Sequence, residues 1–146
     1  MAKTHTYLNF QNQTEEAFNF YKSVFGGEFV DKVYRFKDTP LQPGQPTMSE
    51  ADGNLIMHLE LELLGGHHLM GTDAPESMGF KINMGNNVSI SLEPDSREEA
   101  KKLFDALSAG GMVKMPLADM FWGAYYGDFV DKFGVQWMIN VPNKQQ

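Results

Sequence analysis

The chain has 146 residues, 42% of them hydrophobic and 12% aromatic, which is enough to bury the core of one domain or of two very small subdomains. A formal net charge of −7 and the lack of any Lys/Arg cluster argue against nucleic-acid binding, which needs concentrated positive charge. The absence of cysteine excludes disulfides, thiolate metal sites and cysteine nucleophiles. No apolar run approaches the roughly 20 residues of a membrane span and no signal-peptide core is present, so we expect a cytoplasmic protein without membrane contact.

The first half of the chain predicts a strand, a helix and then further strands. Residues 4–10 are rich in aromatic and β-branched side chains, as strands are, and residues 15–25 repeat apolar side chains at helical spacing. Thr14 is the expected N-cap of this helix, and Gly26 with Gly27 ends it. The remaining elements of this half are a strand over residues 28–36, an exposed connection with three prolines over 37–53, and strands over 55–63 and 67–72.

The strand over residues 55–63 has the clearest alternation of apolar and polar side chains. One predicted face holds Leu55, Met57, Leu59, Leu61 and Leu63, and the other holds Ile56, His58, Glu60 and Glu62. Residues two apart on a strand lie about 6.6 Å from each other, so His58 and the two glutamates can together hold a proton or a cation. A solvated outer face is the alternative, and we favour it for the two glutamates. His67 and His68 are adjacent, face opposite ways on a strand, and are predicted to be turn residues.

The second half repeats this order after a linker over residues 74–87. It predicts a strand over 88–93, a helix capped by Ser96 and ended by Gly110 and Gly111, and a strand over 112–115. The aromatic runs 122–130 and 135–141 flank a turn and predict a closing β-hairpin. Each half therefore has strand, helix, Gly-Gly and three strands. The predicted fold is α+β, with βαβββ modules over residues 1–73 and 88–146.

The segments that carry this repeat resemble a known superfamily. THTYLNF, EEAFNFYKSVFGGE, LIMHLEL and FWGAYYGDFVDKFGVQWMI together resemble the vicinal oxygen chelate proteins (glyoxalase, bleomycin-resistance and extradiol dioxygenase proteins), and most of all their PhnB-like branch. The most specific positions are Trp122, Gly123, Tyr126, Gly127, Asp131, Phe133, Gly134 and Trp137. Lys132 stands where this branch usually carries proline. The resemblance implies curved mixed sheets that form half-barrels, helices packed outside, a cavity enclosed by paired modules, and a homodimer.

The resemblance also implies where a metal would bind. Metal-dependent members hold a divalent cation with His, Glu or Gln on cavity-facing strands, and His5 lies where the first ligand falls. The last-strand position aligns with Met138, and the position at the start of the second module falls at Val88 or Ser89. A thioether is a poor ligand for such cations. We therefore expect no metal cofactor, with a divalent metal ion held by His5 and Glu60 as the alternative.

The leading hypothesis is a PhnB-like protein that holds a small apolar or planar ligand in the cavity between its modules. The candidate ligand-binding residues are His5, Tyr7, His58, Glu60, Trp122, Tyr126 and Met138. Aromatic side chains provide rigid contact area for such a ligand, but they also build cores and dimer interfaces. One alternative is a metal-dependent lyase, isomerase or dioxygenase. Another is a drug-sequestering resistance protein, whose acidic surface would suit cationic ligands. A methyltransferase finds no support because no Rossmann pattern is present. We assign no catalytic residue.

Overall fold

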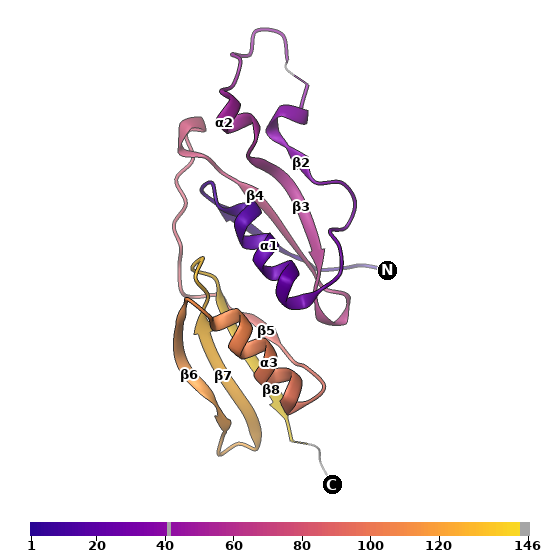
Figure 1. Ribbon diagram of the computed structural model, residues 1–146, viewed down its shortest axis with the longest axis vertical. Helices are drawn as coiled ribbons and strands as arrows, with labels where there is room; N and C mark the ends of the chain where they lie inside the picture. Colours follow the sequence, from indigo (N-terminus) through magenta and orange to yellow (C-terminus); the bar gives the residue numbers. More distant parts are fainter. Residues whose placement is uncertain (41, 144–146) are drawn as a thin grey trace. The chain divides into compact units, whose positions relative to one another are not determined.

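The computed structural model describes residues 1–40 and 42–143, and the chain divides into two compact units, Met1–Asn83 and Met84–Gln146 (Figure 1). Residue 41 of the predicted connection and residues 144–146 of the predicted second module lie outside the described residues. Each unit holds one open, four-stranded mixed sheet, so the α+β prediction with two βαβββ modules is confirmed. No helix among the described residues is both long and apolar enough to cross a membrane.

The first unit is built on a sheet with the strand order β1-β4-β3-β2. Its strands are β1 (Thr6–Phe10), β2 (Tyr34–Arg35), β3 (Ile56–Glu62) and β4 (His68–Asp73). Its helices are α1 (Thr14–Phe25) and the short α2 (Glu50–Gly53), with 3-10 turns η1 (Phe36–Asp38), η2 (Leu64–Gly66) and η3 (Glu76–Met78). β1 runs parallel to β4, whereas β3 runs antiparallel to β4 and β2. Figure 1 shows α1 lying across β3 and β4.

The second unit repeats this topology with the order β5-β8-β7-β6. Its elements are β5 (Ile90–Leu92), α3 (Arg97–Ser108), β6 (Met112–Asp119), β7 (Ala124–Val130) and β8 (Gln136–Pro142). β5 is parallel to β8, and β7 is antiparallel to both β8 and β6. The predicted closing hairpin is therefore β7 and β8. β6 is longer than predicted because it continues through Pro116, which an edge strand tolerates.

A glycine in each sheet lets the helix approach closely. In the first unit a Cβ on Gly71 of β4 would lie 2.5 Å from Cε1 of Phe18, a buried residue of α1. In the second unit a Cβ on Gly127 of β7 would lie 2.8 Å from Cε2 of Phe104 of α3. An aromatic ring thus packs on bare backbone in both units, so each helix covers one face of its sheet and leaves the other face to the remaining side chains.

The buried carboxylate of Asp73 fixes the start of α1. Its Oδ1 accepts hydrogen bonds from the backbone N–H (3.1 Å) and the hydroxyl (2.7 Å) of Thr14, and its Oδ2 accepts from the N–H of Ile56 (2.8 Å). The predicted N-cap role of Thr14 is therefore wrong: Gln13 is the N-cap residue, and Thr14 is fully buried inside the first turn. The second cap is confirmed, since the Ser96 hydroxyl accepts from the N–H of Glu99 (3.1 Å).

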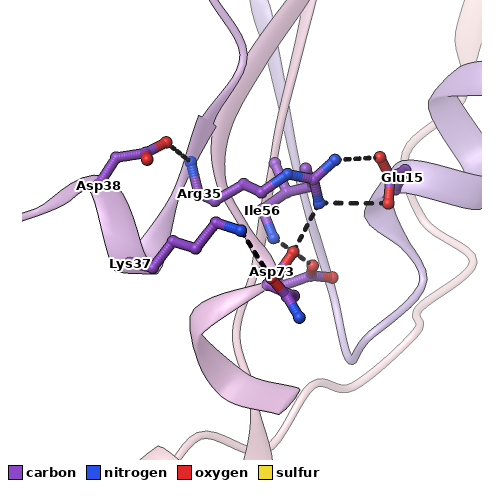
Figure 2. A network of polar contacts seen from close by, with 7 residues as sticks. Glu15, Arg35, Lys37, Asp38, Ile56 and Asp73 are labelled. Atoms are coloured by element: carbon purple, nitrogen blue, oxygen red, sulfur yellow. Dashed lines mark hydrogen bonds and ion pairs between the residues drawn. The ribbon is translucent and has the colours of Figure 1, made fainter. Parts of the chain in front are cut away.

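Arg35, a residue of β2, joins this strand to α1 and to the residue that ends α2 (Figure 2). Its guanidinium binds both carboxylate oxygens of Glu15, at 2.5 and 3.3 Å, and the carbonyl oxygen of Asn54 at 2.6 Å. Its backbone N–H donates to Asp38 (2.8 Å), and the ammonium of Lys37 donates to the side-chain oxygen of Asn54 (2.9 Å). The hydrogen bond from Arg35 holds the pKa of Glu15 below its usual value, although partial burial opposes it.

Two details of the first sheet differ from the sequence prediction. The strand predicted over residues 28–36 is reduced to β2 and an isolated bridge between Phe29 and Leu61, because Asp31 adopts a left-handed φ of 57° that interrupts an extended run. Ile56, predicted on the polar face of β3, is fully buried. The pairing of β2 with β3 shifts register at Tyr34 and Arg35, and the simple alternation ends there.

Candidate ligand-binding faces

The face of the first sheet opposite α1 carries a row of functional side chains. Strand pairing sets Tyr7 of β1 opposite Met70 of β4, and Met70 opposite Glu60 of β3. His58 and His68 are two residues from Glu60 and Met70 on the same strands, so they share this face. The sheet thus brings the predicted residues Tyr7, His58 and Glu60 together.

Glu60 is the centre of this group. One of its carboxylate oxygens is hydrogen-bonded to Nδ1 of His68, and the other lies 3.6 Å from Nε2 of His58. The Glu60 side chain is only 17% exposed. Burial works to raise its pKa, but the hydrogen bonds and charges of His68 and His58 outweigh burial and hold this pKa below its usual value. Glu60 is therefore an ionised, mostly buried carboxylate between two imidazoles.

His5 and Tyr7 extend this group along the first strand. The His5 ring stacks on His68 with 4.7 Å between ring centroids, and its Nδ1 accepts a hydrogen bond from the backbone N–H of His68 (3.3 Å). The ring of Tyr7, which is 48% exposed, lies 5.9 Å from His58. His67 lies on the far side of this strand end, where its Nε2 is 2.8 Å from the hydroxyl oxygen of Thr6.

The prediction that His67 and His68 are turn residues is wrong for His68. It is the first residue of β4 and its ring points at Glu60, whereas His67 directly follows η2. A groove of about 450 Å³ opens beside this strand end. The groove is lined by both of these histidines, by His5 and by Glu62.

The donors do not fit the divalent-metal site that the superfamily implies. Each oxygen of Glu60 already faces an imidazole, and Nδ1 of His5 accepts an N–H. Within residues 1–40 and 42–143, no three His, Asp or Glu side chains are grouped so that they could hold a metal ion. On the second sheet, Met138 takes the position that the resemblance assigns to a ligand, and a thioether does not suit a hard or borderline cation.

The second sheet has an equivalent row. Ser91 of β5 lies opposite Met138 of β8, and Met138 lies opposite Asp128 of β7. Methionine therefore flanks an acidic residue in both modules, as Met70 flanks Glu60 in the first. This relation was not visible in the sequence, because the strand pairing that creates it joins residues far apart in the chain.

Tyr126 and Trp122 lie beside this second row. The Tyr126 hydroxyl donates a hydrogen bond to Asp128 (2.8 Å), and burial, with a smaller contribution from Asp128, raises the pKa of Tyr126 to about 12. The Trp122 ring packs edge-on against Tyr126 at 5.9 Å and is 53% exposed. Of the three predicted residues of this module, Tyr126 binds Asp128, Met138 is paired opposite it, and Trp122 contacts Tyr126. The sequence analysis missed Asp128 itself.

Comparison with known proteins supplies the family context. A family model described as 3-demethylubiquinone-9 3-methyltransferase matches residues 2–140. The crystal structure of protein PA1353 from Pseudomonas aeruginosa is 35% identical, with a TM-score of 0.82 over 99% of this chain and 100% of that one. The putative 3-demethylubiquinone-9 3-methyltransferase, PhnB protein, from Bacillus cereus is 26% identical, with a TM-score of 0.73 over 96% and 99% of the two chains.

A more distant structure supports the fold alone. It is a glyoxalase/bleomycin resistance protein/dioxygenase family enzyme from Burkholderia phytofirmans, 19% identical, with a TM-score of 0.60 over 93% of this chain and 96% of that one. Its fold agrees with the two βαβββ modules described above.

Proposed function

The chain belongs to the family described as 3-demethylubiquinone-9 3-methyltransferase, in the PhnB-like branch of the vicinal oxygen chelate superfamily, and we propose that it binds a small, planar, largely apolar molecule. The open face of the first sheet is the proposed binding surface. The observation that carries the proposal is the group formed by Glu60, His58 and His68 on that face.

This group has the properties of a polar anchor for a ligand. A mostly buried carboxylate loses hydration and is retained only where partners compensate it, and here both partners are imidazoles that can either donate or accept a proton. His58 is 32% exposed, so it can meet a ligand while Glu60 holds its ring in place. The ligand therefore needs at least one hydrogen-bonding group on an otherwise flat body.

Two tyrosine rings provide the flat contact area. Tyr7 lies beside His58, and Tyr34 of β2 is paired opposite His58 on the other side. Both rings are more than 40% exposed, so a ligand can reach them. A planar molecule placed over His58 would cover apolar surface on both rings.

The activity in the family description is not part of this proposal. The described strands form two mixed sheets, each with one parallel pair, and not the doubly wound parallel sheet on which nucleotide cofactors bind in Rossmann folds. A metal-dependent lyase, isomerase or dioxygenase has no support from the donors described above. Ligand binding anchored by Glu60 needs neither a nucleotide cofactor nor a metal ion.

Calorimetric titration with planar aromatic acids, amides and phenols tests the proposal. We expect at least one compound to bind, and Glu60→Gln to weaken that compound about tenfold, because Gln cannot pair with both imidazoles in the same way. Glu16→Gln is the matched control: it removes an exposed carboxylate of α1, on the other side of the sheet, and should leave affinity within about twofold. Equal losses in both variants, or no binding by any compound, would contradict the proposal.

A homodimer is part of the same proposal. β6 is an eight-residue strand at the edge of its sheet, and its side chains Met112, Val113 and Met115 are exposed. An exposed apolar edge strand favours pairing with a second chain. Multi-angle light scattering at micromolar concentration should give twice the 16.5 kDa chain mass, and a clean monomer would contradict this part.

A further inference from the structure

Asp128 on the second sheet is an acidic side chain without a cationic partner among the described residues. It is partly buried, and its hydrogen bond is with the neutral hydroxyl of Tyr126. Lys114, next in sequence to Met115 of β6, donates to Gln136 (2.7 Å), and Arg97 lies on α3, which covers the other face of the sheet, where it pairs with Asp119. Across the strands its neighbours are apolar thioethers, Met115 on β6 and Met138 on β8.

The equivalent position of the first module has the partners that Asp128 lacks. Glu60 occupies the same place in its row, next to Met70, and is compensated by two imidazoles. A carboxylate that has lost part of its hydration costs free energy unless a positive charge or several donors replace the water. Within residues 1–40 and 42–143, Asp128 has one neutral donor, so its face favours a positive charge supplied by a ligand.

Exposed aromatic rings adjoin Tyr126, the hydrogen-bond partner of this carboxylate. Trp122 packs edge-on against Tyr126, and Phe121, which is 97% exposed, packs edge-on against Trp122 with 5.1 Å between ring centroids. The faces of such rings attract cations, and tryptophan does so most strongly. Carboxylate and rings therefore present the two interactions that an aromatic cation uses.

We propose that the open face of the second module binds a planar organic cation, with its charged group against Asp128 and its ring against Trp122 and Tyr126. The inference rests on the proposed function only in treating the chain as a small-molecule binder, because it concerns another sheet and other residues. A neutral ligand would leave the carboxylate uncompensated. A divalent metal would find one carboxylate and a phenol among thioethers, which is too few hard donors.

Benzamidinium and its neutral analogue benzamide test this inference. Binding is followed by tryptophan fluorescence, because Trp122 is half exposed whereas Trp137 is fully buried. We expect benzamidinium to bind and benzamide to bind at least tenfold more weakly. Asp128→Asn should weaken benzamidinium about tenfold or more, as expected for loss of a charged hydrogen-bond partner. Asp105→Asn, which makes the same charge change on the exposed face of α3, is the matched control and should stay within about twofold.

A second variant keeps the test decisive if Asp128→Asn folds poorly. Trp122→Ala removes a half-exposed ring and should weaken benzamidinium several-fold, measured by calorimetry. The inference is overturned if benzamide binds as tightly as benzamidinium, or if neither Asp128→Asn nor Trp122→Ala changes affinity. Loss of benzamidinium binding in Glu60→Gln but not in Asp128→Asn would also overturn it, and would leave the proposed function of the first sheet intact.

Discussion

Asp131 offers the sharpest stability prediction, because one buried carboxylate organises the whole turn between β7 and β8. Its Oδ1 accepts hydrogen bonds from the backbone N–H groups of Phe133 (2.8 Å) and Val135 (3.0 Å), and its Oδ2 accepts from the indole N–H of Trp137 (2.8 Å). Asp131 is 3% exposed and Trp137 is fully buried. Replacing Asp131 with alanine leaves these three donors without this acceptor.

The expected loss follows from what can replace each bond. A hydrogen bond to a charged group contributes about 1.5–3 kcal/mol, and water can partly replace it at the turn amides but not at the buried indole. We therefore expect Asp131→Ala to lower the free energy of unfolding by about 4 kcal/mol. Asp131→Asn should cost about half of that, because its oxygen can still serve the turn while its amide nitrogen faces the indole N–H.

Urea unfolding followed by circular dichroism measures these changes, and Trp137→Phe completes a double-mutant cycle. In the Trp137→Phe background the donor is gone, so Asp131→Asn should cost clearly less than it does in the wild type. A loss below about 1 kcal/mol for Asp131→Ala would refute the assigned role. So would strict additivity of Asp131→Asn and Trp137→Phe.

Three further predictions concern single residues. Because the pKa of Glu60 is lowered in the folded protein, its carboxylate stabilises the fold above the ordinary pKa of 4.5, and this contribution is lost as pH falls through the folded-state pKa. The difference in unfolding free energy between wild type and Glu60→Gln should therefore shrink on acidification. A difference that does not change with pH would contradict the pairing of Glu60 with the two histidines. Tyr126, with its pKa raised to about 12, should titrate well above the ordinary tyrosine value of 10.0 in ultraviolet absorbance, and Tyr126→Phe should remove that late step. The same shift lowers stability between about pH 10 and 12, by up to roughly 3 kcal/mol, and an early, ordinary titration would disprove it. Gly127→Ala should lower the free energy of unfolding by about 1–3 kcal/mol, because the new Cβ would lie 2.9 Å from backbone atoms of β6. Gly85→Ala is the control and should be near neutral, because the nearest atom to its Cβ would be 3.4 Å away. Equal losses of stability in the two variants would argue against the close approach at Gly127.

The sequence predicts the modules well because their signals are local. The helix cap at Ser96, the paired glycines and the aromatic runs of the closing hairpin each act within a few residues, and the structure agrees with all of them. The prediction that Thr14 is the N-cap was wrong because a distant residue, Asp73, accepts hydrogen bonds from both its N–H and its hydroxyl. No pattern near Thr14 could show this.

The candidate sites were harder to predict for the same reason. His58 and Glu60 share one strand, so their common face follows from alternation, but His68 reaches Glu60 only through the register of β3 and β4. Asp128 could have been found from the hairpin, since it lies two residues after Tyr126 on the same predicted strand. Its relation to Met138 depends on the β7–β8 pairing, which alternation alone does not give.

The central claim, that a planar ligand binds over the Glu60 group, is tested most directly by mapping a bound ligand on the protein by two-dimensional NMR. For the tightest compound of the aromatic panel, we predict that the largest chemical-shift changes fall on Tyr7, His58, Glu60 and His68. These changes should disappear in Glu60→Gln but persist in Glu16→Gln. Changes confined to other residues, or identical changes in both variants, would contradict the claim.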